Sequence, residues 1–362
     1  MSSVRDLSKT KRRPFKVFRR IKALLFFDKT RVIYHGDSFE SFWEEYYADA
    51  HRNCFSAFKI KLQARRAYLD DGFRLDEFYL LDLENKKKKE RDLFLSRNKK
   101  DEFLISYYGP EWHRILGQLM DKYSFYTSLN AFFKREAIII SSSEDRSSFL
   151  SFCGRYPHIF AKRDKGSCGI GAKSFTVYDD KQAGKVFDEL VASGEWIIEE
   201  MIHQDPLISA FNASSINTVR YPSFKHNGVV KSVFPCMRFG RAGSIIDNST
   251  LGGLTVAIDE KTGEFFPYAY DEKGNVHEVH PDSKIPFRGF HVPQWDVLIE
   301  FVRKAHLALP DDQVYVAFDL AFSEKGWCIV EGNWGDWFLQ QFTRKRGLKK
   351  EFVSLLRGYD NQ

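Results

Sequence analysis

The pattern of apolar residues changes once along this chain, near residue 134, and this change restricts the possible folds more than any other feature. From about Phe39 to Ala131 apolar residues recur at spacings of three and four, which predicts a region of helices. After Lys134 come short β-rich runs such as EAIII, HIFAKRD, KSFTVYD and EWIIEEMI, separated by Gly, Asp and Ser turns with few helices between them. We therefore predict an α+β protein with mixed or antiparallel sheets and a helical N-terminal region.

Length and charge set further limits. With 362 residues the chain is long enough for two units, which we place at residues 1–118 (helical) and residues 119–362. The formal net charge of +6, from 55 basic and 49 acidic residues, is too small for this length to predict nucleic-acid binding. Anionic small molecules and a membrane surface both stay compatible with it.

The cysteine and histidine spacings predict neither a disulfide framework nor a metal site. The five cysteines are widely scattered and form no CxxC pair, as expected for a reducing cytosolic compartment. His277 and His280 have a loose metal-like spacing, but no third ligand of matching type is near them in the sequence, so we predict two loop residues. The sequence also contains no nucleophile elbow or catalytic-cysteine signature, which disfavours a covalent protein intermediate.

The N-terminal segment KTKRRPFKVFRRIKALLFFDK interleaves apolar and cationic side chains. Its apolar run, Ile21 to Phe27, is too short to span a membrane and precedes no small-residue cleavage site, so we do not expect a secretory signal. One interpretation is a basic amphipathic helix at residues 11–27 that lies on the anionic cytoplasmic face of a membrane. The other is a helix that docks on the rest of the protein.

Three polar residues lie at one end of a predicted β-hairpin near the C-terminus. VYVAFDLAF and WCIVEGNW are separated by the turn SEKG, so Asp319 and Glu331 fall on neighbouring strands. Because side chains alternate along a strand, Asn333 points the same way as Glu331. Oxygen ligands of this kind suit Mg2+ that bridges nucleotide phosphates, so the candidate metal ligands are Asp319, Glu331 and Asn333. A polar cluster at a strand end, without a metal, fits the same residues.

A glycine-rich loop between two predicted strands is a candidate phosphate site. In HIFAKRDKGSCGIGAKSFTV a lysine ends an apolar strand, a glycine loop follows, and another strand begins. Glycines let backbone N–H groups approach phosphates, and the lysine adds a positive charge. A Rossmann fingerprint or a P-loop would need a helix after the glycines, so both are disfavoured, whereas a flexible hairpin loop remains an alternative. The candidates are Lys162, Gly166, Ser167, Gly169 and Gly171.

The segment EWIIEEMIHQD has the pattern of a hinge strand between two lobes. Its backbone groups are suited to hydrogen-bond an adenine edge, with Ile198, Met201 and Ile202 packing on the faces of the base. Glu199 and Glu200 stay unranked, because a shift of one residue exchanges the side chain that faces the cleft. A plain core strand fits this segment equally well.

These signals, taken in order, resemble the ATP-grasp superfamily. The resemblance implies two α+β lobes with ATP between them and a lid at about residues 135–200. It also implies that Lys122 (in MDKYSFY) and Lys162 contact phosphates, that residues 199–202 contact adenine, and that the cofactors are ATP and Mg2+. The Asp…Glu-x-Asn set at residues 319, 331 and 333 matches the magnesium ligands of that fold.

A closer resemblance, covering nearly all of the chain beyond about residue 35, is to the sugar-transfer-associated ATP-grasp group. It rests on GFRLDEFY, SSINTVRYPSF, CMRFGRAGSIIDNSTLGGLTVAID, HPDSKIPFRGFHVPQW and VEGNWGDW. That group is similar to teichuronopeptide-type ligases, which are linked to polysaccharide biosynthesis. The implied reaction is carboxylate–amine ligation through an acyl-phosphate, with an amino acid or amine attached to a cell-surface polysaccharide or its precursor.

Two arginines and one polar loop complete the predicted site. Arg220 (in SINTVR) and Arg238 (in CMRFG) are the candidate catalytic residues, placed to clamp the γ-phosphate and the charge that develops on the acyl-phosphate. Surface ion pairs are the alternative for both, and a structural turn is the alternative for the loop. The candidate acceptor-binding residues in this loop are Asp247, Asn248, Gly252 and Gly253.

Two other functions fit the same sequence. A site that delivers the γ-phosphate to a carboxylate can also deliver it to a hydroxyl, which gives an ATP-dependent sugar kinase. A non-catalytic nucleotide-binding scaffold in polysaccharide assembly is the third possibility, although the complete set of predicted ligands argues against it. The expected partners are small-molecule or glycan carboxylates and amines, in a cytoplasmic protein with a possible membrane contact through residues 11–27.

Overall fold

The computed structural model describes residues 43, 44, 47, 54–164, 171–244, 252–334 and 337–358. The chain divides into two compact units, residues 1–101 and 102–362. Our domain boundary after residue 118 stays a prediction, and the basic segment at residues 11–27 lies outside the described residues. Among the helices that the structure describes, none has both the length and the apolar character needed to cross a bilayer.

The first unit is helical in its described part, as predicted. The carboxylate of Glu77 connects two helices of this unit, because it accepts hydrogen bonds from the backbone N–H groups of Arg74 (3.0 Å) and Arg97 (2.8 Å). These two groups lie where two helices begin, and helix N-termini leave such donors without intrahelical partners. The helices are α3 (Cys54–Asp71), α4 (Leu75–Leu80), α5 (Lys88–Arg91) and α6 (Arg97–Tyr108), which continues into the second unit.

The second unit begins with the rest of the helical region, which ends at Phe133. Asp121 caps the helix that carries Lys122, because its carboxylate accepts the N–H of Ser124 at 2.8 Å. Lys122 is therefore the first residue of its helix. The helices here are α7 (Trp112–Met120), α8 (Lys122–Ser128) and α9 (Asn130–Phe133).

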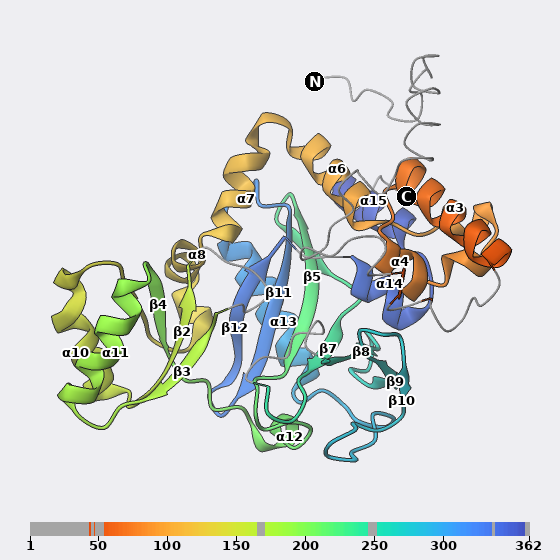
Figure 1. The fold of residues 1–362 in the computed structure, drawn as a ribbon. Coiled ribbons are helices and arrows are strands. Elements are labelled where there is room, and N and C mark those ends of the chain that lie inside the picture. The colour runs from red at the N-terminus through yellow and green to blue at the C-terminus, as the bar shows by residue number, and fades with distance from the viewer. Residues whose placement is uncertain are drawn as a thin grey trace. The chain divides into compact units, whose positions relative to one another are not determined.

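A small antiparallel sheet with two helices on one face spans residues 137–200 (Figure 1). We call this lobe the lid, after the lid predicted at about residues 135–200, and its role as a lid stays a prediction. The strands are β1 (Ala137–Ile140), β2 (His158–Arg163), β3 (Lys173–Thr176) and β4 (Trp196–Glu200), in the order β1-β4-β2-β3. The helices are α10 (Arg146–Arg155) and α11 (Asp180–Ala192). Phe149 and Phe187 pack from these helices onto Ile159 and Ile198 of the sheet. The expectation of few helices between the strands after residue 134 is wrong. The apolar face of the small sheet would be exposed without α10 and α11, and both helices bury their own apolar side chains against it.

The large sheet has eight strands, and every pairing in it is antiparallel. The strands are β5 (Thr218–His226), β6 (Val229–Ser232), β7 (Cys236–Phe239), β8 (Leu254–Ile258), β9 (Phe265–Tyr270), β10 (Val276–His277), β11 (Tyr315–Ser323) and β12 (Gly326–Asn333). Their order is β10-β9-β8-β7-β5-β11-β12, with β6 also paired to β5. The remaining helices are α12 (Pro206–Ser209), α13 (Trp295–Ala308), α14 (Phe338–Arg344) and α15 (Lys349–Arg357). The predicted hairpin of VYVAFDLAF and WCIVEGNW is β11 and β12.

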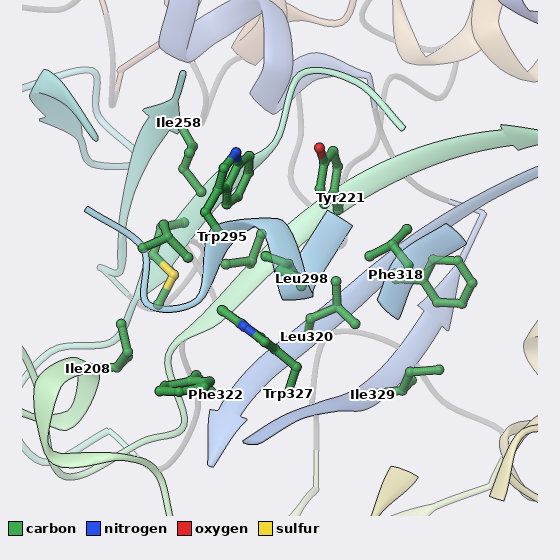
Figure 2. Close-up of a cluster of buried hydrophobic side chains, with 14 of the residues drawn as sticks. Ile208, Tyr221, Ile258, Trp295, Leu298, Phe318, Leu320, Phe322, Trp327 and Ile329 are labelled. Carbon is green, nitrogen blue, oxygen red and sulfur yellow. The ribbon is translucent and has the colours of Figure 1, made fainter. Parts of the chain in front are cut away.

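The main core lies between the large sheet and α13 (Figure 2). Trp295 and Leu298 of α13 pack against Tyr221 of β5 and against alternate residues of β11, including Phe318 and Leu320. Because side chains alternate across a strand, the residue between Phe318 and Leu320 faces the opposite side of the sheet. That residue is Asp319, the predicted metal ligand.

A β-bulge interrupts this alternation in β12. Ile329 lies opposite Leu320 and faces the core, but the next pair is Glu331 with Asp319, so Val330 is an extra residue in β12. Without the bulge, Glu331 would follow Ile329 at a spacing of two and would also face the core. The bulge moves Glu331 onto the face of the sheet that carries Asp319.

The next residue, Gly332, lies where the structure leaves no room for a side chain. A Cβ atom at this position would lie 2.7 Å from Cε1 of Phe125, a buried ring of α8. We expect Gly332→Ala to lower the free energy of unfolding by about 1–3 kcal/mol, measured by urea denaturation. Gly117→Ala is the matched control, because a Cβ there meets nothing within 4 Å and α7 should gain about 0.5–1 kcal/mol. An unchanged stability of Gly332→Ala would contradict the packing argument.

Candidate active site

Three predicted site residues from distant parts of the sequence line one pocket. Lys122 begins α8, Lys162 lies near the end of β2, and Glu331 lies beyond the bulge of β12. Asp164 ties the first two segments together, since its carboxylate accepts the backbone N–H of Tyr123 at 3.0 Å. The pocket is lined by Leu119, Lys122, Phe125, Phe133, Lys162, Val330, Glu331 and Gly332. The fold therefore places two cations and one carboxylate around an apolar floor.

Burial changes the acid–base behaviour of the first lysine. It lowers the pKa of Lys122 below its ordinary value, although the nearby carboxylate of Glu331 opposes this shift. The charged form of Lys122 is thus poorly compensated in the protein alone. An anionic ligand in the pocket would stabilise it, which is the behaviour expected of a phosphate-binding lysine.

Of the two acidic residues at the end of β4, Glu199 is the one that faces this site. Its register opposite Phe160 places it on the same face of the lid sheet as Lys162. The Lys162 Nζ is 2.9 Å from Glu199 Oε1, and an Nη2 of Arg135 donates to the same oxygen at 3.1 Å. Burial would raise the pKa of Glu199, but Arg135 and Lys162 hold it below its ordinary value. Glu199 is therefore an ionised carboxylate that orients the lysine.

Glu200 has a different environment. It pairs with Lys325 of the β11–β12 turn at 2.6 Å, and its partner is more than half exposed.

Ile198, predicted to pack on adenine, is fully buried in the lid core between the sheet and its helices, so that prediction is wrong. Met201 and Ile202 follow β4 and are partly exposed, so they stay candidates for contact with a base.

The carboxylate of Asp319 is the centre of a second charged cluster. Arg220 of β5 donates to both of its oxygens, at 2.8 and 2.7 Å, and Arg238 of β7 donates to one at 3.0 Å. Asn333 adds a hydrogen bond from Nδ2 at 3.0 Å. Burial would raise the pKa of Asp319, but Arg220 and Arg238 lower it below its ordinary value. Asp319 is consequently ionised across the physiological pH range.

Asn333 joins this cluster to the pocket. The same Nδ2 that contacts Asp319 also donates to Glu331 Oε1 at 3.3 Å. The described residues contain no group of three or more His, Cys, Asp and Glu side chains that could hold a metal ion. Two carboxylates and one amide are nevertheless a fitting donor set for Mg2+, which takes one or two carboxylates and completes its shell with phosphate and water oxygens.

The two predicted loops are described only in part. Of the glycine loop, Gly171 is described and has φ of +80°, whereas Gly166, Ser167 and Gly169 lie outside the described residues. The flanking β2 and β3 pair in antiparallel fashion, as the strand–loop–strand pattern predicted. Of the acceptor loop, Gly252 has φ of +82° and Gly253 is buried, whereas Asp247 and Asn248 lie outside the described residues.

Two residues of this region were missed or misjudged from the sequence. Arg135 was not predicted, because a single arginine between a helix and a strand carries no motif. Both His277 and His280 were predicted as loop residues, which is wrong for His277, because it lies in β10. His280 does lie in a loop, but it is fully buried there and its Nε2 donates to the carbonyl of Gly240, directly after β7. Burial lowers the pKa of His280, so the ring is neutral at physiological pH and holds the chain beyond Arg238.

Comparison with known families gives a match for part of the chain. Residues 181–355, from α11 into α15, match the model of the family described as Sugar-transfer associated ATP-grasp, which agrees with the predicted family and fold. No curated protein matches the sequence.

Similar solved structures are distant. D-alanyl-alanine synthetase A from Vibrio cholerae is 12% identical, with 66% of this chain and 65% of that chain covered and a TM-score of 0.40. The VanG D-Ala:D-Ser ligase from Enterococcus faecalis is 11% identical, with 67% and 61% covered and a TM-score of 0.42. N5-carboxyaminoimidazole synthase from Aspergillus clavatus is 11% identical, with 72% and 58% covered and a TM-score of 0.40. This chain spans less than two thirds of each of them.

The cluster around Asp319 predicts a pH dependence of stability. Because the folded pKa of Asp319 lies below its unfolded value of about 3.9, its contribution is complete above that value and is lost as the pH falls through the folded pKa. We expect the difference in free energy of unfolding between the wild type and Asp319→Asn to be constant from pH 8 to about pH 5 and to shrink in more acidic solution. Urea titrations at several pH values measure it. Asp188→Asn, at an exposed lid pair with Arg146, should show little difference at any pH.

Proposed function

We propose that the protein is an ATP-dependent carboxylate–amine ligase, because residues 181–355 match the model of the sugar-transfer associated ATP-grasp family. ATP and Mg2+ are the cofactors of this fold. The observation that carries the proposal is the convergence of Lys122, Lys162 and Glu331 on one pocket. Asn333 joins this pocket to Asp319, so the cations proposed for a polyphosphate lie beside the oxygen ligands proposed for its metal.

Each group has a role in the proposed nucleotide site. Lys122 and Lys162 bind phosphate oxygens, and Glu199 holds Lys162 through the 2.9 Å ion pair. Met201 and Ile202 lie after β4, where a base would contact the hinge. Asp319, Glu331 and Asn333 would hold Mg2+, which neutralises phosphate charge when bound. Catalysis then depends on positioning and charge, with no protein nucleophile.

Arg220 and Arg238 are the proposed catalytic cations. Both are fixed by Asp319 and both keep about a tenth of their side-chain surface exposed, so an anion can approach them. We assign them to the substrate carboxylate and to the charge of the transferring phosphoryl group. In the proposed reaction a carboxylate oxygen attacks the γ-phosphorus, ADP leaves with its electron pair, and an amine then displaces phosphate from the acyl-phosphate.

The finer assignments extend the proposal from the family. We propose that an amino acid or amine is joined to a carboxylate of a cell-surface polysaccharide or its precursor, on the cytoplasmic side. The acceptor loop around Asp247, Asn248, Gly252 and Gly253 is the proposed seat of the second substrate.

The decisive experiment measures ADP release with ATP and Mg2+ against amino acids and uronic acids, singly and in pairs. We expect turnover only when a carboxylate and an amine are both present. Glu331→Gln should lower kcat at least about 100-fold, because it removes a ligand of the metal that neutralises phosphate charge. Glu300→Gln, which removes an exposed carboxylate paired with Arg303 on α13, is the matched control and should keep wild-type activity.

Other outcomes identify other functions. ADP formed with a sugar alone, together with a phosphorylated sugar, would establish a kinase. Tight ATP binding without turnover for every pair, including lipid-linked glycans, would indicate a scaffold. Turnover that survives in Glu331→Gln would refute the assigned metal site.

The predicted N-terminal helix adds a membrane test, since a lipid-linked glycan would make membrane contact useful. Deletion of residues 1–30 should abolish binding to vesicles that contain anionic lipid and leave ATP affinity unchanged, because the cationic residues 11–27 supply the attraction. Sedimentation with anionic and neutral vesicles measures this binding. Equal sedimentation of the full chain and the deletion variant would disprove the contact.

A further inference from the structure

Arg135 is a buried cation with contacts on both sides of the proposed site. It lies between α9 and β1, and only 3% of its side chain is exposed. Its guanidinium group donates to Glu199 Oε1 in the lid at 3.1 Å. It also donates to two carbonyls of β12, those of Ile329 at 2.6 Å and Val330 at 3.3 Å. One side chain thus links the lid to the strand that carries Glu331.

The two carbonyls of β12 belong to the β-bulge. Val330 is the extra residue of this strand, so the regular ladder with β11 is interrupted there. A buried carbonyl without a partner costs free energy, and Arg135 supplies donors to both carbonyls. Arg135 therefore stabilises the local geometry that turns Glu331 toward Asp319.

The same guanidinium group supports the wall of the pocket. It lies 4.9 Å from the centre of the Phe133 ring, and it donates to the Phe133 carbonyl at 3.3 Å. Phe133 and Val330 both line the pocket, whereas Arg135 itself does not. Its contacts are therefore with residues behind the pocket and not with a ligand in it.

The ion pairs of Glu199 connect Arg135 to Lys162. Glu199 is buried and receives both Arg135 and Lys162 on one oxygen. Removal of Arg135 would leave Lys162 as the only ion-pair partner of Glu199 among the described residues. The carboxylate would then attract the lysine more strongly, and the lysine would interact less with a phosphate. At the same time the bulge carbonyls would lose their donors. Both changes affect nucleotide binding without a direct contact.

We infer that Arg135 is a positioning residue that couples the lid to the metal-binding strand: it sets Lys162 through Glu199 and sets Glu331 through the bulge at Val330. This inference rests on the proposed nucleotide site, and it adds a residue to which that proposal assigns no role. A change in the lid that moves Glu199 is transmitted by Arg135 to the carbonyls next to Glu331.

Isothermal titration of ATP, with and without Mg2+, tests the inference in the full chain. Arg135→Met should weaken binding of Mg2+–ATP by roughly 10–100-fold, the range typical for loss of a group that orients metal ligands. Its binding of ATP without metal should weaken less, because only the effect on Lys162 remains. Arg135→Lys keeps the charge near Glu199 but lacks the planar fork, so it should restore metal-free ATP binding and leave Mg2+–ATP binding weak.

Arg155→Met is the matched control. Arg155 pairs with Glu136, the residue beside Arg135, but on the exposed surface, so wild-type affinity is expected. A double-mutant cycle with Glu199→Gln should show that the two losses are not additive, because both act on Lys162.

Three results would overturn the inference: wild-type affinity in a folded Arg135→Met protein, an equal loss in Arg155→Met, or additive losses in the cycle. Thermal unfolding and circular dichroism of each variant identify a protein that fails to fold, in which case Arg135→Lys decides. Because ATP binding is the readout, the absence of ligation with every substrate pair would refute the proposed reaction and leave this test intact. Failure of the wild type to bind ATP would refute both.

Discussion

The β-bulge at Val330 is the local feature on which the candidate site depends. In a regular strand Trp327, Ile329 and Glu331 would all face α13, and a carboxylate would then lie in an apolar core at a cost of several kcal/mol. One extra residue reverses the alternation, so the core keeps Ile329 and the site receives Glu331. Gly332 follows directly, where the ring of Phe125 leaves no room for a side chain. Residues 329–332 thus satisfy the apolar packing of the core and also place a carboxylate in the candidate site.

Two buried carboxylates of the site, Asp319 and Glu199, each have two cationic partners. Asp319 is held by Arg220 and Arg238, and Glu199 by Arg135 and Lys162. Such pairs often contribute little to net stability, because desolvation offsets the Coulomb attraction. Their value here is positional, since the carboxylates are ionised and the cations are fixed before the proposed polyphosphate ligand binds. Preorganised charge of this kind is the main source of catalysis in phosphoryl transfer.

The lid and the large sheet have separate apolar cores, and polar contacts connect them. The lid core consists of side chains from α10, α11 and the small sheet, and none of them belongs to the cluster around α13. Among the described residues, these contacts include Arg135, which joins Glu199 to β12, Lys325 with Glu200, and Asp164 with the N-terminus of α8. Hydrogen bonds and ion pairs can be exchanged at lower cost than packed apolar surface, which suits the proposed closure of this lobe over a nucleotide.

The sequence by itself predicted the helices up to Phe133, the strands β1 to β4 and the β11–β12 hairpin, and it placed Asp319, Glu331 and Asn333 at one end of that hairpin. Periodicity and turn residues encode these features locally. It did not rank Glu199 above Glu200, and it gave no sign of Arg135 or of the bulge. Only the tertiary structure decided these, because strand register, bulge position and the partner of a single buried arginine depend on which chain segments pack together, and contacts between distant segments leave no local periodic signal.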